Sequence, residues 1–213
     1  MTKSKIILLN ANNLLKPMRL TEYVHLCLEK HLNNGDYVLD ATAGNGYDTL
    51  KAAQLVQPDG RVTAIDIQKD ALQATEEKLT QAKLNTLCEL HLGSHGELLE
   101  RLNQTFDAVL FNLGYLPGSD KMVITTPKET LSALNQSPKL LKATGILCVT
   151  AYRQHPGGQE EADQVAEWMR EKQTQGWSVE KIEPNHTSDY LSPLLWIASK
   201  GTLSIPSFAN RDI

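Results

Sequence analysis

Short runs rich in β-branched and apolar residues alternate with longer runs of helical periodicity along almost the whole chain. This alternation constrains the fold strongly, because successive parallel strands need a crossover, usually a helix, between them. It predicts an α/β protein with a mostly parallel seven-stranded sheet that ends in an antiparallel hairpin. The expected strands cover Asp36–Leu39, Arg61–Ile67, Thr86–Leu92, Phe106–Asn112, Gly145–Tyr152, Trp177–Glu183 and Leu194–Lys200. The expected helices cover Pro17–Leu32, Asp48–Val56, Asp70–Lys83, Gly96–Leu102, Pro127–Leu141 and Glu160–Gln173.

The length of 213 residues corresponds to one domain. We expect an N-terminal arm over residues 1–16, the α/β domain over residues 17–200, and a loose C-terminal tail over residues 201–213. A formal net charge of −4 argues against a protein that coats nucleic acid, but it leaves room for an enzyme that binds one RNA through a local basic patch.

The three cysteines form no CxxC pair, and each lies in an apolar run. We therefore expect reduced packing residues, no zinc site and a cytoplasmic location. No apolar run reaches the length of a signal sequence or of a membrane span, so we expect no membrane association.

A glycine-rich turn links the first expected strand to the helix that follows it. Gly44 and Gly46 allow the backbone to approach a ligand closely. A dinucleotide site would need a third glycine, and this chain has Thr49 at that position. The turn therefore favours S-adenosylmethionine, which carries no pyrophosphate. Asp40 would balance the positive charge of this cofactor or fix the loop. Asp48 would have one of the same two roles, or would complement the helix dipole.

Two further segments follow the second and third expected strands. Asp66 lies about twenty residues after the glycine turn, where a carboxylate can accept both ribose hydroxyls of an adenosine. Gln68 is then placed to line the adenine, as are Ser94 and His95. The alternatives are an ordinary acid at a strand end and a helix cap. His91 and His95 have a spacing that suits a metal, but no acidic or cysteine partner is evident, so we expect no metal site.

The loops after the fourth and fifth expected strands supply the candidate reactive residues. Asn112 can accept a hydrogen bond from an amine, and Tyr115 can stack on the ring that bears this amine. Tyr152 and Arg153 are candidates for substrate binding, and His155 for accepting the proton of the amine. The alternative interpretation is a tight turn at Asn112 and a structural loop that carries His155 on the surface.

These segments resemble the motifs of the bacterial tRNA wobble-uridine methyltransferases, a family long described as rRNA methylases. The similar stretches are DATAGNGYDT, AIDIQ, GSH, FNLGYLPGSDK and YRQHPGG. The resemblance implies the Rossmann-like fold of class I methyltransferases. It also implies transfer of a methyl group from S-adenosylmethionine to 5-aminomethyl-(2-thio)uridine at tRNA position 34, which gives the 5-methylaminomethyl form. Gln154 departs from the pattern, because relatives often have glycine before His-Pro.

The resemblance implies cofactor contacts through Asn45, Gly46, Asp48, Asp66, Gln68, Ser94 and His95. It implies a catalytic-pocket role for Asn112 and Tyr115. The expected partners are a tRNA anticodon stem-loop and, in a homodimer, a second copy of the chain. A local cluster of basic residues would attract the RNA despite the negative net charge; its members are Arg19, Lys121, Lys128 and Arg153. The alternatives are methylation of another RNA base or of a small amine, and a non-catalytic or dehydrogenase-like nucleotide-binding protein.

Overall fold

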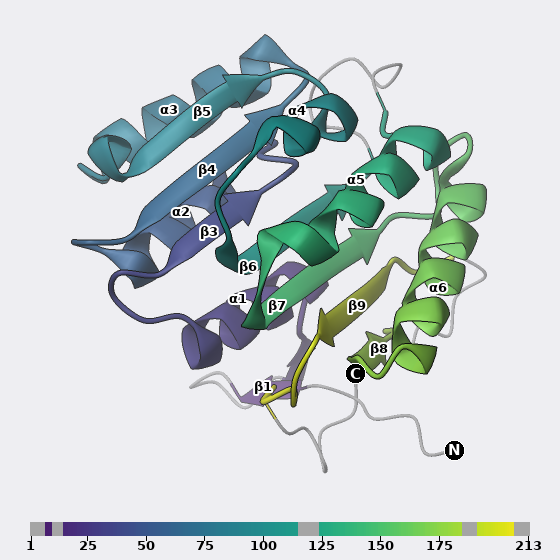
Figure 1. The fold of residues 1–213 in the computed structure, drawn as a ribbon. Coiled ribbons are helices and arrows are strands. Elements are labelled where there is room, and N and C mark those ends of the chain that lie inside the picture. The colour runs from purple at the N-terminus through teal and green to yellow at the C-terminus, as the bar shows by residue number, and fades with distance from the viewer. Residues whose placement is uncertain (1–6, 10–14, 115–123, 185–190, 207–213) are drawn as a thin grey trace.

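One sheet of seven strands forms the centre of the computed structural model, which describes residues 7–9, 15–114, 124–184 and 191–206 (Figure 1). Its strands are β3 (Tyr37–Asp40), β4 (Arg61–Asp66), β5 (Cys88–Leu92), β6 (Phe106–Leu113), β7 (Leu141–Ala151), β8 (Ser178–Ile182) and β9 (Leu194–Ser199). The helices are α1 (Leu20–His31), α2 (Tyr47–Val56), α3 (Lys69–Gln81), α4 (His95–Arg101), α5 (Pro127–Leu140) and α6 (Gly158–Thr174), with a short 3-10 helix, η1 (Asn85–Leu87). The expected elements are therefore present, with ends that differ by a few residues.

The strand order is β5-β4-β3-β6-β7-β9-β8. Strands β3 to β7 are parallel, whereas β9 pairs antiparallel with both β7 and β8. Within this sheet the first strand along the chain is β3. The next two strands, β4 and β5, lie on one side of it, and β6 lies on the other side. Ligands of such sheets bind at the carboxyl ends of the strands where the order reverses. The order confirms the predicted fold class and places the candidate site at the ends of β3 and β6.

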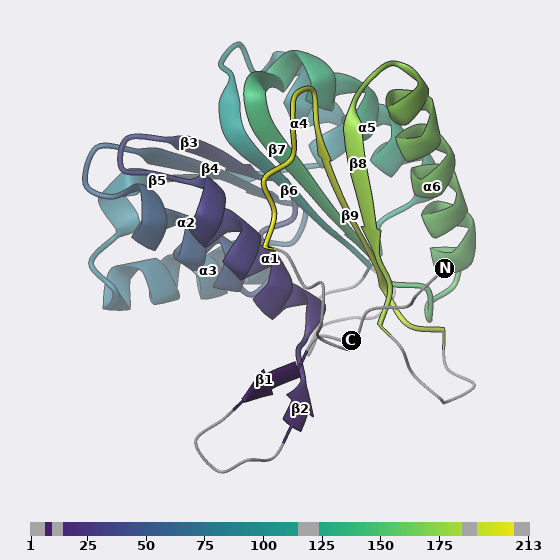
Figure 2. The ribbon, with the colours of Figure 1, turned by 90° about the horizontal axis from the view of Figure 1, so that it is seen from below.

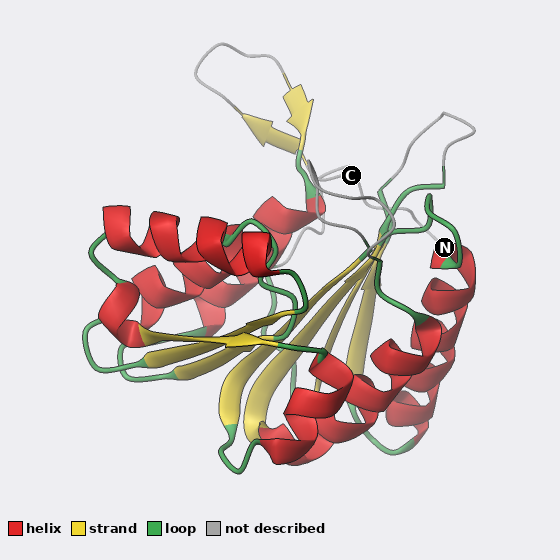
Figure 3. Cartoon of the chain, turned by 90° about the horizontal axis from the view of Figure 1, so that it is seen from above, coloured by secondary structure: helices red, strands yellow, loops and turns green. Residues whose placement is uncertain are grey.

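Helices cover both faces of the sheet (Figure 3). Successive strand residues point to opposite faces. Val38 packs in the core cluster that includes residues of α1, α2 and α3, and Leu39 packs in the cluster that includes residues of α4, α5 and α6. Both side chains are fully buried, because parallel strands are covered on both faces.

The described residues near both ends of the chain have structure outside the seven-stranded sheet. The segment expected as an arm contains an antiparallel pair, β1 (Ile7–Leu9) and β2 (Leu15–Pro17), which projects from the body of the molecule (Figure 2). The tail expected to be loose packs against the core through Leu203 and Ile205, and the Lys30 ammonium donates a 2.8 Å hydrogen bond to the Ile205 carbonyl. These contacts pair sequence positions too distant for any local pattern to reveal.

The three cysteines are free, and Cys27 and Cys148 are buried in the apolar core. Burial raises the pKa of the Cys27 and Cys88 thiols to about 12. Such thiols are poor nucleophiles at neutral pH, so a packing role is favoured. No helix within the described ranges has the length and apolar composition to cross a membrane.

Candidate functional site

The glycine turn forms a tight connection between β3 and α2. Gly44 and Gly46 have φ values of +54° and +76°, in the left-handed region that glycine adopts without strain. A Cβ atom on Gly46 would lie 2.7 Å from the Thr75 Cα, so α3 also excludes a side chain there. The Thr75 hydroxyl donates to the Gly44 carbonyl over 3.2 Å. Asn45 is half-buried at the tip of this turn.

Asp40 lies beneath this turn and is only 1% exposed. Its carboxylate accepts hydrogen bonds from the Thr49 hydroxyl at 2.6 Å and from the Thr42 amide at 3.2 Å. Burial, followed by the neighbouring Asp48 charge, raises the pKa of Asp40 to about 7. Of the two roles considered for Asp40, this setting favours fixing the loop. Thr49, which occupies the position of the third glycine of a dinucleotide motif, is the residue whose hydroxyl holds Asp40 in place.

Asp66 is the last residue of β4, and its side chain contacts both the loop after β3 and the loop after β4. It accepts hydrogen bonds from the backbone amides of Gly44, at 2.8 Å, and of Gln68, at 2.9 Å. The Ile67 amide also contributes a hydrogen bond, and since a carboxylate has about four acceptor positions, capacity remains for a ribose hydroxyl. Burial is the largest influence on the pKa of Asp66, which it raises. Ile67 is 55% exposed beside it, an apolar surface that the sequence analysis did not single out.

Ser94 and His95 begin α4 and both lie close to α5. The Ser94 hydroxyl accepts from the Gly96 amide at 3.2 Å and donates to the Glu129 carboxylate at 3.0 Å. The His95 ring meets the Phe111 ring edge-on, with 5.9 Å between centroids. Its buried Nε2 has no hydrogen-bond partner among the described residues, and burial lowers its pKa. These contacts favour the helix-cap alternative for Ser94 and leave His95 a neutral imidazole with one free nitrogen.

His91 does not join His95 in a metal site. It lies on β5, and its Nε2 is 3.7 Å from the exposed Glu89 carboxylate. Among the described residues, no group of three or more histidine, cysteine, aspartate and glutamate side chains is arranged to hold a metal ion.

Asn112 lies near the end of β6, at the point where the strand order reverses. Its amide nitrogen donates to Asp48 Oδ2 over 2.6 Å, and its backbone amide donates to the Thr42 hydroxyl over 2.6 Å. The other Asp48 oxygen lies 2.6 Å from His25 Nε2. His25 was missed in the sequence analysis, because it occurs in an ordinary helical pattern far from every motif. The structure thus joins two predicted residues and one unpredicted residue.

The substrate-binding candidates have different surroundings. Tyr115 and Lys121 lie outside the described residues. Tyr152 directly follows β7 and is 40% exposed. Arg153 is held within the protein, since its Nε donates to the Ser192 carbonyl at 2.6 Å and its guanidinium pairs with Glu183 at 2.9 Å. These bonds tie the loop after β7 to the connection between β8 and β9.

His155 is buried under the same loop. Its side chain is only 3% exposed, and its Nε2 lies 3.9 Å from the Glu161 carboxylate. Glu161 also accepts hydrogen bonds from the hydroxyls of Thr125, at 2.8 Å, and Thr130, at 2.5 Å. Burial is the largest influence on the pKa of Glu161, which it raises. His155 is therefore not the surface residue of the structural alternative, and its burial beside Glu161 favours a role in holding the loop after β7.

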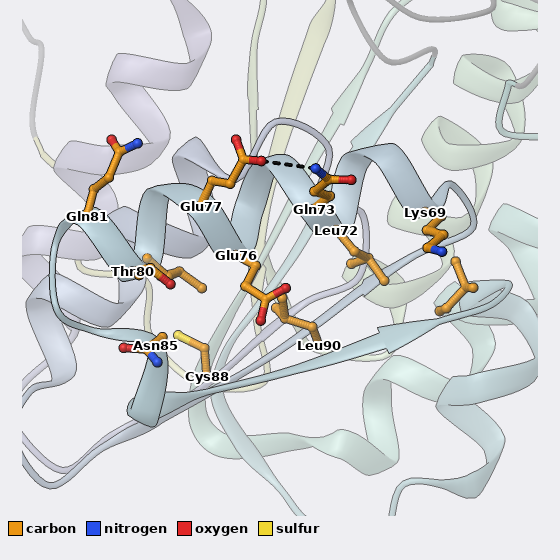
Figure 4. Close-up of a pocket in the computed structure, with 12 residues that line it drawn as sticks. Lys69, Leu72, Gln73, Glu76, Glu77, Thr80, Gln81, Asn85, Cys88 and Leu90 are labelled. Carbon is orange, nitrogen blue, oxygen red and sulfur yellow. Dashed lines mark hydrogen bonds between the residues drawn. The ribbon is translucent and has the colours of Figure 1, made fainter.

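A surface pocket of about 1060 Å³ lies between α3 and the edge strand β5 (Figure 4). Its lining mixes apolar residues such as Leu72 and Leu90 with polar ones such as Glu76 and Thr80. None of the predicted site residues that the structure describes lines it. The candidate site is therefore the row of adjacent strand ends β4-β3-β6-β7, where Asp66 and Asn112 offer acceptor positions.

Two family models match the chain. The model described as "Putative rRNA methylase" matches residues 62–198, which is more than half of the chain and includes β6 and β7. The model described as "Protein-L-isoaspartate(D-aspartate) O-methyltransferase (PCMT)" matches residues 14–104, which include the glycine turn.

One curated relative is "tRNA (mnm(5)s(2)U34)-methyltransferase, chloroplastic" of Arabidopsis thaliana, with 41% identity over 161 residues. The alignment covers 69% of this chain and 57% of the relative, so the chain spans little more than half of that protein.

Solved structures of methyltransferases are also similar to this chain. A "putative rRNA-methylase" from Clostridium thermocellum has 32% identity and a TM-score of 0.81, over 87% of this chain and 99% of the other. A "putative methyltransferase" from Streptococcus mutans, solved with S-adenosylhomocysteine, has 31% identity and a TM-score of 0.75, over 86% of this chain and 98% of the other. The fold is therefore that of the class I methyltransferases.

Proposed function

The chain belongs to the family described as "Putative rRNA methylase", and from this membership we propose that it is a methyltransferase that uses S-adenosylmethionine. We propose that it methylates the aminomethyl nitrogen of 5-aminomethyl-(2-thio)uridine at wobble position 34 of tRNA, which gives the 5-methylaminomethyl form. The Arabidopsis relative, whose name states that modification, supports this substrate.

The observation that best supports an amine substrate is the free amide oxygen of Asn112. This oxygen is buried and has no hydrogen-bond partner among the described residues. An unpaired buried acceptor costs about 1–3 kcal/mol, so it is expected where a ligand supplies the missing donor. An amine supplies such a donor, and its lone pair stays free for the methyl group.

The residues at the strand ends fit S-adenosylmethionine. Asp66 retains acceptor capacity for a ribose hydroxyl, and Gly44 exposes backbone next to it. Asp48 provides a negative charge close to Asn112. When bound, S-adenosylmethionine supplies an electrophilic methyl group on a sulfonium ion. Gln68, Ser94 and His95 remain our candidates for the adenine side, with Ile67 as an added apolar contact.

Asn112 and Tyr115 are our candidates for the substrate side. Asn112 would accept an N–H of the neutral amine and so aim its lone pair, and Tyr115 would stack on the uridine ring. Methyl transfer to an amine needs an in-line approach and little acid–base machinery. The proposed site is consistent with that need, because positioning groups dominate it.

We propose the tRNA anticodon stem-loop as the macromolecular partner, and Tyr152 is an exposed candidate contact. A homodimer and a cytoplasmic location also remain proposals. The free cysteines are consistent with a reducing compartment.

The test is a methyl-transfer assay with labelled S-adenosylmethionine and bulk tRNA from cells that lack this gene. The tRNA is then digested and its nucleosides are identified. Label in 5-methylaminomethyl-(2-thio)uridine, formed about 10²-fold more slowly with the Asn112→Ala protein, would support the proposal. Label only in ribosomal RNA, offered in parallel, or only in small amines would refute the wobble-uridine substrate.

A further inference from the structure

Three elements distant in sequence meet at the two oxygens of one carboxylate. Asp48, in the first turn of α2, is 2.6 Å from His25 Nε2 through Oδ1 and 2.6 Å from Asn112 Nδ2 through Oδ2. His25 comes from α1 and Asn112 from β6. The side chains of His25 and Asp48 are 27% and 13% exposed. The three residues form a chain of hydrogen bonds that ends at the proposed site of methyl transfer.

The chemistry of a carboxylate fixes the direction of both bonds. An ionised carboxylate only accepts hydrogen bonds, so both partners must donate to it. His25 therefore carries its proton on Nε2, and Asn112 turns its NH₂ group toward Asp48. The Asn112 carbonyl oxygen must then point the other way, where it is buried and has no partner among the described residues. The orientation of this acceptor follows from Asp48 rather than from Asn112 itself.

Asp48 alone would hold Asn112 only loosely. Its carboxylate can rotate about the bond that joins it to Cβ, because terminal torsions of this kind have broad energy wells. A second hydrogen bond, to Oδ1, removes that freedom. Without it the Asn112 amide could turn and satisfy its buried oxygen elsewhere, and the acceptor would be lost.

We propose that His25 is a positioning residue for methyl transfer, which acts by fixing Asp48 so that Asn112 presents its carbonyl oxygen to the substrate amine. This inference rests on the proposed function and extends it to α1. His25 makes no contact with the reacting atoms in this account. It acts on the rate of transfer, and cofactor affinity changes little without it, because Asp48 keeps its position in α2 and its charge.

The same helix offers a matched control. His31 also reaches β6 from α1, through a 3.2 Å contact between its Nε2 and the Asp107 carbonyl. That contact involves the amino-terminal end of β6 and does not involve Asp48. His25→Phe and His31→Phe therefore make the same chemical change and each removes one contact between α1 and the rest of the protein. They differ in whether the Asp48 chain is broken.

We expect His25→Phe to lower kcat about tenfold, with the Kd for S-adenosylmethionine and the KM for tRNA within about twofold of wild type. His25→Gln, whose amide nitrogen can replace Nε2 as the donor, should keep at least about a third of the wild-type kcat. His31→Phe should keep kcat and change only the melting temperature. Equal effects of the two phenylalanine variants on kcat, or a His25→Phe effect confined to cofactor affinity, would overturn the proposal.

A double-mutant cycle tests whether His25 acts through Asn112. In an Asn112→Ala background, His25→Phe should lower kcat by less than about twofold, because the group it positions is gone. A full tenfold loss in that background would show that His25 acts by another route, and would refute the inference.

A spectroscopic readout separates failure of this inference from failure of the proposed function. The ¹⁵N-labelled side-chain NH₂ of Asn112, assigned by its absence in Asn112→Ala, should shift in His25→Phe and keep its position in His31→Phe. If wild-type protein methylates no tRNA but this shift occurs, the substrate is wrong and the chain of hydrogen bonds stands. If the resonance does not move, the inference fails whatever the substrate.

Discussion

Asp40 shows how one buried residue sets a pH dependence. Its pKa is raised from 3.8 to about 7, first by burial and then by Asp48. The folded protein therefore holds this proton more tightly than the unfolded chain does. The stability that results is fully present below pH 3.8 and is lost as the pH rises toward 7.

Asp40→Asn should remove this part of the pH dependence. An asparagine can still accept from the Thr42 amide and can donate to the Thr49 hydroxyl. We therefore expect the stability of Asp40→Asn relative to wild type, measured as the difference in their free energies of unfolding, to increase steadily from about pH 4 to about pH 7. Urea unfolding of both proteins at several pH values measures the difference. A difference that is constant across this range would contradict the assigned protonation.

Gly46→Ala tests the shape of the cofactor turn. The left-handed conformation costs a non-glycine residue about 1–2 kcal/mol, and the new Cβ would also collide with the α3 backbone at Thr75. Gly35→Ala is the matched control, since Gly35 has a φ of +89° and nothing within 4 Å of its Cβ position. We expect Gly46→Ala to lower the melting temperature more than Gly35→Ala does. Only Gly46→Ala should weaken S-adenosylmethionine binding in calorimetry.

Asn112 and Asp66 should separate into reaction and cofactor roles. Asn112→Ala should lower the methylation rate by about 10²-fold, the loss typical of one positioned polar group, with cofactor affinity almost unchanged. Asp66→Ala should instead raise the Kd for S-adenosylmethionine. Single-turnover rates and calorimetry measure the two effects. Wild-type turnover in the first variant, or wild-type affinity in the second, would remove that residue from its assigned role.

At the scale of elements, Glu161 connects α6 to α5 and to the loops that follow β6 and β7. It receives hydrogen bonds from Thr125 and Thr130 in a fully buried position. The described residues just before and within α5 therefore depend on an acid in the first turn of α6.

Glu161→Ala should destabilise the protein by about 2–3 kcal/mol, because it leaves two hydroxyls without their acceptor. Glu161→Gln keeps one acceptor and should lose less than half as much. Glu160→Ala, an exposed change in the same turn, should cost less than about 1 kcal/mol. Urea unfolding gives the three values. Equal losses for Glu161→Ala and Glu160→Ala would show that the buried connection contributes nothing.

At the scale of the whole molecule, the proposed tRNA substrate requires a chain of net charge −4 to bind an anionic RNA through a local patch. The four expected cations are not equivalent. Lys128 is exposed at the start of α5, whereas Arg153 is only 12% exposed in its side chain and is paired with Glu183. An intramolecular ion pair leaves little charge for a phosphate.

Lys128→Ala should therefore reduce the slope of log affinity for tRNA against log salt by about 0.7–0.9. Arg153→Ala should leave that slope almost unchanged. It should lower the melting temperature, because it removes the bonds to Ser192 and Glu183 that connect the loop after β7 with the connection between β8 and β9. Affinity measured from low to moderate salt tests both. If Arg153→Ala changes the slope as much as Lys128→Ala does, Arg153 contacts phosphate and its pairing with Glu183 opens on binding.

The sequence by itself determined the order of strands and helices and most of their limits. These follow from local periodicity and from glycine turns, which act within a few residues. It also indicated which strand ends carry polar groups, and parallel strands bring those ends to one edge, so Asp66 and Asn112 could be selected in advance.

Only the tertiary structure decided what each polar group does there. Asp40 is buried beneath the turn, Arg153 and His155 are held by intramolecular partners, and His25 reaches Asp48 from 23 positions away. Such pairings depend on which helix crosses which strand end, and no local pattern encodes that. Burial then sets the pKa of each group through the loss of water, a quantity that exists only once the chain has folded.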